Sequence, residues 1–193
     1  MRIMNRFLLA VILLGCAAFQ RAPADPSPSD AFFERLRALC GQSFEGRLAS
    51  PPTAADAAFA GPISVRVQDC TTDQVRMPVA VGADRSRTWV VTRTGQGLVL
   101  KHDHRHADGT EDAVSQYGGA TAGPGTASRQ EFPADAFSKA LFERQNLTAS
   151  LTNVWALEIQ PGATLAYELN RPGRHFRIAF DLTRPAPRDG GLP

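Results

Sequence analysis

The sequence predicts a mainly β domain: an antiparallel up-and-down barrel of about 8–10 strands, with one helix before it and one helix inserted late. Apolar and polar residues alternate with period 2 in short runs over much of the chain. Turn residues separate most of these runs, so consecutive strands are expected to pair as hairpins. A sheet of this many strands with one apolar face tends to close on itself, because closure removes exposed edges. A two-sheet sandwich is the alternative.

The composition fits a single globular domain. The chain has 193 residues, of which 43% are hydrophobic and 21% are charged, enough for a sizeable core. These values exclude a disordered chain, a fibrous repeat and a polytopic membrane protein. The formal net charge is +2, and Arg2 and Arg6 supply this excess, because the chain from residue 16 onward carries 19 basic and 19 acidic residues. No nucleic-acid partner is therefore expected.

Residues 1–15 are predicted to be a signal peptide. A positively charged start precedes the apolar run 7–15 (FLLAVILLG), which is too short to cross a bilayer as a helix. The run ends in Leu-Leu-Gly-Cys16, which resembles the lipobox of bacterial lipoproteins. The resemblance implies a lipid anchor on Cys16. In that family an alanine after the cysteine, here Ala17, implies sorting to the periplasmic side of the outer membrane. The alternative is a soluble secreted or periplasmic protein, cleaved after Ala24 in an A-x-A-like site.

The segment between the anchor and the domain is predicted to be a flexible tether. Residues 16–30 include three prolines and show no periodic apolar pattern. The barrel domain is expected over 31–183, with a flexible tail at 184–193. Its first element is expected to be a helix over 31–40 that Asp30 caps. The apolar face of that helix would contain Phe32, Phe33, Leu36 and Leu39.

Cys40 and Cys70 are predicted to form a disulfide. Once Cys16 is lipidated or removed, they are the two cysteines left in an exported chain. Closing a loop of about 30 residues should stabilise the fold by roughly 3–4 kcal/mol in the chain-entropy model. The alternative is a pair of buried free thiols.

The strands are expected to follow the first helix in sequence order. Pro78 favours an edge strand or a bulge, and Asp108-Gly109 is expected to be a hairpin turn. Trp89, Trp155 and Tyr167 are expected in the core or on a cavity wall. The predicted strands cover residues 44–48, 63–68, 75–81, 87–94, 98–106, 111–117, 129–132, 151–159, 164–170 and 174–183.

Two other segments interrupt the strands. The glycine-rich run 118–127 (GGATAGPGTA) is predicted to be a mobile loop at the rim of the barrel. The late helix is expected to open at Pro133-Ala134-Asp135 and to run to about Leu147. Its apolar side would contain Phe137, Leu141 and Phe142.

The start of the first strand resembles a known family. Residues 39–46 (LCGQSFEG) are similar to the L-x-G-x-W-x-G opening of calycin-type barrels, the lipocalins, fatty-acid-binding proteins and their relatives, with Phe44 in place of the tryptophan. The order of elements is similar too, and the resemblance implies a calycin-like barrel. Residues 84–94 and 100–119 look like stretches of secreted proteobacterial proteins, a resemblance that implies no activity.

Three histidines form the main candidate site. His102, His104 and His106 alternate along one predicted strand and therefore share one face. Leu98 and Leu100 precede them on that face, which is expected to point into the barrel. The opposite face is expected to carry a solvated row of ion pairs formed by Lys101, Asp103 and Arg105.

A metal site is one interpretation of this histidine stripe. A turn at Asp108-Gly109 would place Glu111 opposite His106, and Ser115 opposite His102. Two imidazoles and a carboxylate, from His104, His106 and Glu111, would then suit Zn²⁺, or Fe²⁺ with open positions. The alternative is a hydrogen-bonded polar patch at the barrel mouth, in which Ser115, Tyr117 or Glu111 partners the histidines. His175 is expected to face outward.

The sequence does not favour an enzyme, because it has no G-x-S-x-G elbow and no phosphate loop; no catalytic residue is assigned. The leading prediction is an envelope lipoprotein that holds a small apolar or amphipathic ligand in the barrel. This ligand would be a small molecule or a lipid. Its candidate ligand contacts are His102, His104, His106, Glu111 and Tyr117. One alternative is a Zn- or Fe-dependent protein, and another is a structural or assembly lipoprotein.

Overall fold

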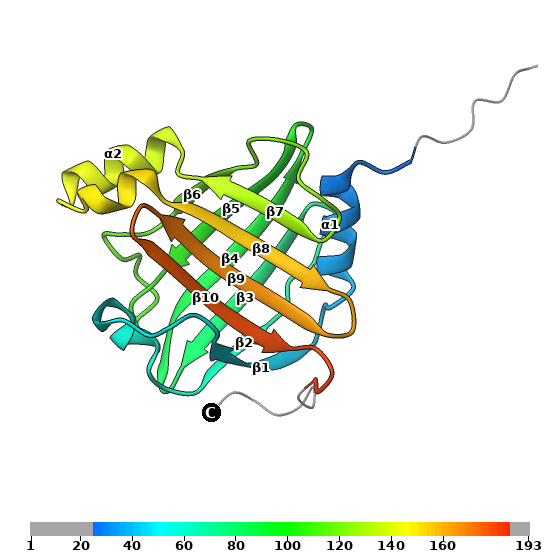
Figure 1. Cartoon of the computed structure of the whole chain (residues 1–193), viewed down its shortest axis with the longest axis horizontal. Coiled ribbons are helices and arrows are strands. Elements are labelled where there is room, and N and C mark those ends of the chain that lie inside the picture. Colours follow the sequence, from blue (N-terminus) through cyan, green and yellow to red (C-terminus); the bar gives the residue numbers. More distant parts are fainter. Residues whose placement is uncertain (1–24, 186–193) are drawn as a thin grey trace, which may run out of the picture.

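The computed structural model describes residues 25–185, which form one ten-stranded antiparallel sheet curled into a nearly closed barrel (Figure 1). The predicted signal peptide, Cys16 and most of the tail lie outside the described residues. The strands are β1 (Ser43–Leu48), β2 (Ile63–Arg66), β3 (Gln74–Val81), β4 (Asp84–Thr94), β5 (Gly97–His104), β6 (Tyr117–Ala120), β7 (Arg129–Pro133), β8 (Val154–Gln160), β9 (Thr164–Arg171) and β10 (Arg174–Asp181).

The strand order is that of an up-and-down barrel. It runs β6-β5-β4-β3-β2-β1-β10-β9-β8-β7, so strands that follow one another in sequence lie side by side except at β6 and β7. The first strand pairs with the last, through Gly46–Phe180, Arg47–Ala179 and Leu48–Ile178. This confirms the predicted fold class. Pro78 does not lie on an edge, because β3 runs between β2 and β4, but the β3–β4 register shifts between Val79 and Val81 directly after it.

Helix α1 (Pro28–Arg37) covers one end of the barrel (Figure 1). The predicted cap, Asp30, is wrong: Ser27 is the N-cap, and its Oγ accepts a hydrogen bond from the Asp30 backbone N–H. Proline at the first helical position costs no hydrogen bond, since that N–H has no partner within the helix. Residues 28–30 therefore belong to the helix rather than to the predicted tether. The predicted apolar face is confirmed at Phe32, Phe33 and Leu36, which are fully buried. The helix ends at Arg37 rather than at residue 40, so Leu39 lies beyond it and is only partly buried.

The predicted disulfide is confirmed. Cys40 follows α1, Cys70 follows β2, and the two Sγ atoms are bonded. The bond joins the segment after the helix to the β2–β3 connection. It thereby holds the end of α1 against the sheet.

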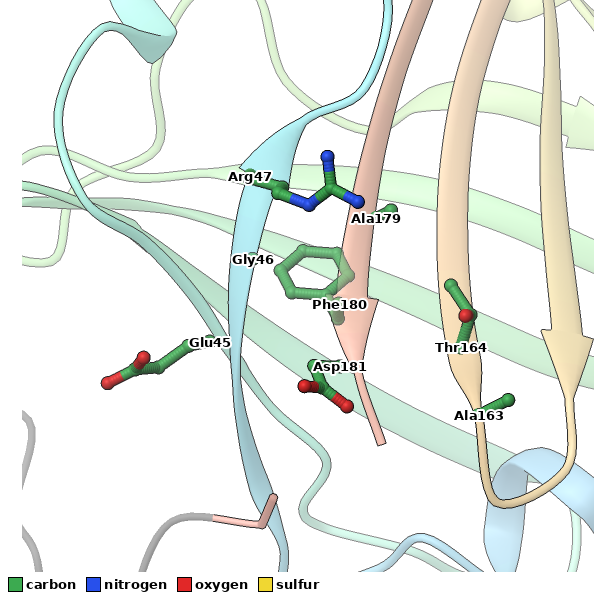
Figure 2. A pocket seen from close by; sticks show the side chains of 8 residues that line it. All are labelled: Glu45, Gly46, Arg47, Ala163, Thr164, Ala179, Phe180 and Asp181. Atoms are coloured by element: carbon green, nitrogen blue, oxygen red, sulfur yellow. The ribbon is translucent and has the colours of Figure 1, made fainter. Parts of the chain in front are cut away.

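The interior of the barrel is filled by side chains. Phe44, Met77, Leu100, Leu157 and Phe180 are all at most 1% exposed. Gly46 is required by this packing, because a Cβ there would lie 2.5 Å from the Phe180 ring. Figure 2 shows that ring beside Gly46, at a surface hollow of about 350 Å³ where β1 and β10 separate. Its other lining side chains are small or charged, so the hollow does not fit an apolar ligand.

A glycine pair and one serine close the seam between β6 and β7. Residues 118–120 belong to β6 rather than to the predicted mobile loop. A Cβ at Gly118 would lie 1.9 Å from the carbonyl oxygen of Leu100, and one at Gly119 would lie 1.8 Å from that of Pro133. The Ser138 Oγ accepts from the Gly118 N–H at 2.7 Å and donates to the Gly118 carbonyl at 2.8 Å. Strands β6 and β7 are not paired by a ladder of backbone hydrogen bonds. The close approach of the two glycines and the hydrogen bonds of Ser138 hold this seam together instead.

Ser138 belongs to α2 (Ala136–Arg144), which lies at the other end of the barrel (Figure 1). Two 3-10 helices that the sequence did not predict lie at the same end, η1 (Ala54–Phe59) and η2 (Thr148–Thr152). Helix α2 begins directly after the predicted opening at Pro133-Ala134-Asp135, and Asp135 is its N-cap. The helix ends before the predicted Leu147. The predicted apolar side is wrong at Phe137, which is 50% exposed, because the buried position next to it belongs to Ser138 at the seam. None of the helices in the described chain has the length and hydropathy to cross a membrane.

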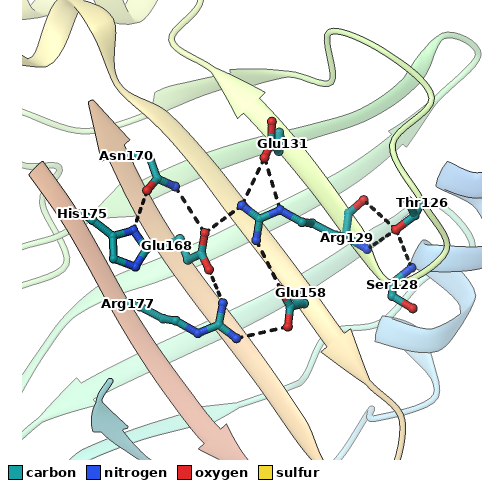
Figure 3. Close-up of polar contacts among 9 residues, drawn as sticks. All are labelled: Thr126, Ser128, Arg129, Glu131, Glu158, Glu168, Asn170, His175 and Arg177. Atoms are coloured by element: carbon teal, nitrogen blue, oxygen red, sulfur yellow. Dashed lines mark hydrogen bonds and ion pairs between the residues drawn. The ribbon is translucent and has the colours of Figure 1, made fainter. Parts of the chain in front are cut away.

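An ion-pair network crosses the outer face of β7–β10 (Figure 3). Glu168 of β9 lies between Arg129 of β7 and Arg177 of β10, and Glu158 of β8 pairs with both arginines. Burial would raise the pKa of Glu168, but hydrogen bonds from the two arginines and Asn170 outweigh it and lower that pKa to about 2. The network links the four strands beside the seam.

Candidate functional site

A pocket opens at the end of the barrel opposite α1, and we call it the mouth pocket. Its volume is about 290 Å³, and its walls come from η1, α2, η2 and strands β6, β8, β9 and β10. Six aromatic side chains line it: Phe59, Tyr117, Phe142, Trp155, Tyr167 and Phe176. Because side chains fill the barrel below it, space for a ligand lies at the mouth rather than along the barrel axis.

His102 lies beneath this pocket and is 2% exposed. Its Nδ1 lies 3.1 Å from the carbonyl oxygen of Tyr117, and a carbonyl only accepts, so Nδ1 carries the proton. Its Nε2, 2.8 Å from the Tyr167 hydroxyl, must then accept from that hydroxyl. Burial lowers the pKa of His102 to about 3. The imidazole is therefore neutral, and its tautomer is set by its neighbours.

The other two stripe histidines differ from His102. His104 is half-buried, its Nε2 lies 3.1 Å from the Tyr117 hydroxyl, and burial followed by the charge of Arg87 lowers its pKa. His106 lies beyond the end of β5 and is exposed. The expectation that all three histidines face the interior is therefore wrong at His106. Tyr117 contacts both inner histidines, as the polar-patch interpretation expected, and burial raises its pKa to about 12.

The register that the metal site required is wrong. His102 pairs with Tyr117 instead of Ser115, and Glu111 bridges to Arg105 instead of His106. The reason is an irregular connection between β5 and β6, in which Gln116 adopts a φ of 57°. Within residues 25–185, no three His, Cys, Asp or Glu side chains lie where they could hold a metal ion. The set of His104, His106 and Glu111 is thus not assembled.

Asp103 explains part of this irregular connection. The predicted solvated row is wrong at Asp103, which is 4% exposed. Its carboxylate accepts hydrogen bonds from Arg76 at 2.9 Å, from Arg105 at 3.0 Å and from Gln116 at 3.1 Å. Burial would raise its pKa, but these contacts outweigh it and lower the pKa. Satisfying this buried carboxylate draws Gln116 and Arg105 toward it.

Two arginines that the sequence reasoning missed lie on the rim of the mouth pocket. Arg171 and Arg174 are directly paired across the β9–β10 hairpin, and both line the pocket. Arg174 is neutralised by Asp56, at 2.6 Å. Arg171 uses Nη1 to donate to Ser150 Oγ at 3.2 Å and to Asn153 Oδ1 at 3.3 Å, and it makes no ion pair within the described part of the chain. Burial, followed by the charge of Arg174, lowers the pKa of Arg171.

A sequence signal for Arg171 exists. Leu165, Tyr167 and Leu169 occupy alternate positions of β9, and Tyr167 and Leu169 line the mouth pocket with Arg171. Extending that alternation by one step reaches Arg171 on the same inward face. The predicted strand stopped one residue short of it. His175, by contrast, is exposed as expected and lies 2.6 Å from Asn170 Oδ1.

Comparisons of the chain with the models of known protein families, with curated proteins and with solved structures gave no match. We therefore infer a function only from the barrel and the chemistry of its mouth.

Proposed function

We propose that this protein binds a small apolar or amphipathic molecule in the mouth pocket. The observation that carries the proposal is the lining: six aromatic side chains from separate elements surround about 290 Å³, with polar groups at the rim. Binding sites are commonly concave, mostly apolar and equipped with a few convergent polar groups. Drug-sized ligands occupy pockets of about 300–1,000 Å³, so this volume favours a small ligand.

The polar groups beneath the pocket favour binding over catalysis. His102 is neutral, and both of its nitrogens are already hydrogen-bonded. Burial raises the pKa of Tyr167 well above its ordinary value, so its hydroxyl stays protonated. A general base needs a free acceptor with a pKa near the working pH. This pair instead forms a satisfied polar floor beneath the aromatic walls.

We further propose that the chain is exported and anchored in the bacterial envelope through Cys16. The charged start, the apolar run and the Leu-Leu-Gly-Cys motif support export, and a disulfide between Cys40 and Cys70 suits an oxidising compartment. Metabolic labelling with a tagged fatty acid should mark the protein, and Cys16→Ser should abolish the label. An unlabelled wild-type protein whose N-terminus begins at Asp25 would instead show simple secretion.

A neutral fluorescent probe tests the binding proposal. N-phenyl-1-naphthylamine should brighten and shift to the blue when it enters the mouth pocket. Ala55→Trp fills the pocket from η1 and should abolish the signal, whereas Ala57→Trp, an exposed position of the same helix outside the lining, should keep it. Equal binding by the wild type and Ala55→Trp would show that the pocket is not the binding site.

A further inference from the structure

We infer that the ligand is a compact aromatic anion, with its ring among the aromatic walls of the mouth pocket and its carboxylate or sulfonate on Arg171. This inference rests on the proposed function and names the ligand class for the same pocket. Three features of the described residues lead to it: an uncompensated cation, free donors on that cation, and walls that suit a ring.

The uncompensated cation is Arg171. Like charges placed directly opposite each other on neighbouring strands destabilise a sheet, yet Arg171 and Arg174 are paired in this way at the rim. Asp56 offsets only Arg174. Ser150 and Asn153, the partners of Arg171, are neutral. One positive charge is therefore left on the pocket wall, where an anionic ligand would offset it.

The guanidinium of Arg171 also keeps donors for a ligand. Both of its hydrogen bonds among residues 25–185 use Nη1, which orients the group against η2 and the start of β8. Nε and Nη2 make no hydrogen bond to the described chain. A guanidinium offers paired N–H donors that match the two oxygens of a carboxylate or sulfonate. Ser150 and Asn153 thus orient the guanidinium, and its Nε and Nη2 donors stay available to an anionic group.

The walls suit an aromatic ring more than an extended chain. Six of the large apolar side chains that line the pocket are rings, against three aliphatic ones, Val114, Leu147 and Leu169. The rings approach one another at tilted angles, such as the 34° between Tyr117 and Trp155. Offset and edge contacts of this kind are favourable for a further ring. A long acyl chain would have to continue down the barrel axis, which Phe44, Met77 and Phe180 fill.

Calorimetric titration with a matched pair of probes tests the inference. 1-Naphthoate and 1-naphthalenemethanol share a ring system and differ in charge. Wild-type protein should bind the naphthoate at least about tenfold more tightly, the effect of one charge-assisted contact. Arg171→Gln should remove that difference by weakening naphthoate alone, and Arg171→Lys should keep part of it. Arg47→Gln, at an exposed arginine that does not line the mouth pocket, should behave as wild type.

The other outcomes separate this inference from the proposed function. Equal affinity for the two probes in the wild type, or naphthoate binding that Arg171→Gln leaves unchanged, would overturn the role of Arg171 while pocket binding stands. Octanoate that binds as tightly as naphthoate would overturn the aromatic preference. Absence of binding by both naphthyl probes and by N-phenyl-1-naphthylamine would overturn the proposed function itself. Circular dichroism and thermal melting of Arg171→Gln and Arg171→Lys establish that each variant is folded.

Discussion

His102 shows how a single buried side chain can make stability depend on pH. It is neutral in the fold, with a pKa of about 3, against an ordinary value of 6.5. Between these two values the unfolded chain binds the proton and the folded chain does not. The contribution of the neutral His102 to the free energy of unfolding is therefore fully present above pH 6.5 and is lost as the pH falls toward 3.

We predict that the free energy of unfolding falls by about 1.4 kcal/mol per pH unit below pH 6 from this residue alone. His102→Gln should lose that part of the pH dependence, although it lowers the stability at neutral pH. His175→Gln, at an exposed histidine, should keep the wild-type slope. Denaturant titrations at pH 7, 6, 5 and 4 measure it; parallel wild-type and His102→Gln curves would contradict the prediction.

Gly46 shows a steric requirement at one position. Its place in the motif resembling the calycin opening was visible in the sequence, but the reason was not, because Phe180 lies 134 positions later and meets it only through β1–β10 pairing. Gly46→Ala should destabilise the fold by about 1–3 kcal/mol through overpacking. Gly95→Ala, where a Cβ meets nothing within 4 Å, is the control. Phe180→Leu in the Gly46→Ala background should recover part of the loss, as chemical denaturation would show.

At the scale of elements, the predicted boundaries differ from the structure where side-chain chemistry outweighs the apolar pattern. Alternation continues past His104, so the sequence predicted a longer strand. The buried carboxylate of Asp103 takes its partners from the following connection and ends the ladder there. Similarly, Phe137 fits an amphipathic pattern, but the seam requires Ser138 at the buried position. Requirements of this kind come from contacts between elements, which a local pattern does not contain.

The seam provides a test at the same scale. Ser138→Ala removes both side-chain hydrogen bonds to the Gly118 backbone and leaves its buried N–H without that partner. We expect a loss of about 1–3 kcal/mol and faster amide exchange at Gly118 than in the wild type. Lys139→Ala, at the exposed next residue, should change neither. Unchanged exchange at Gly118 would mean that the seam is held by other contacts.

At the scale of the whole molecule, period-2 alternation and turn spacing were enough to predict the barrel, because each inward residue is apolar along most strands. The candidate site was predicted only in part. His102 and His104 lie on β5 and Tyr117 lies on the neighbouring strand β6, so the predicted pairing of consecutive strands was enough to bring them near each other. Arg171 and the walls from β8, β9 and β10 lie on neighbouring strands, but they meet Tyr117 of β6 and Phe142 of α2 only because the sheet closes, and closure is a property of the entire chain.

The disulfide also acts on the whole molecule, since it restricts the unfolded chain. The predicted pairing of Cys40 and Cys70 is present, with a sequence separation of 30. Replacing both cysteines with alanine should lower the free energy of unfolding by about 3–4 kcal/mol. The melting temperature of the wild type should fall in the presence of a reductant, while that of the double variant should not change. Equal melting of the two oxidised proteins would contradict this expectation.

The pairing of β1 with β10 has a consequence for biogenesis. The partner of the first strand is made last, so a chain that emerges N-terminus first, from a ribosome or a translocation channel, exposes the open edge of β1 until residues 174–181 have left. The barrel can close only afterwards, since the β1–β10 pairing needs both strands. If the chain is exported as proposed above, it would therefore stay unclosed while it crosses the membrane and would acquire its final shape only after residues 174–181 have crossed.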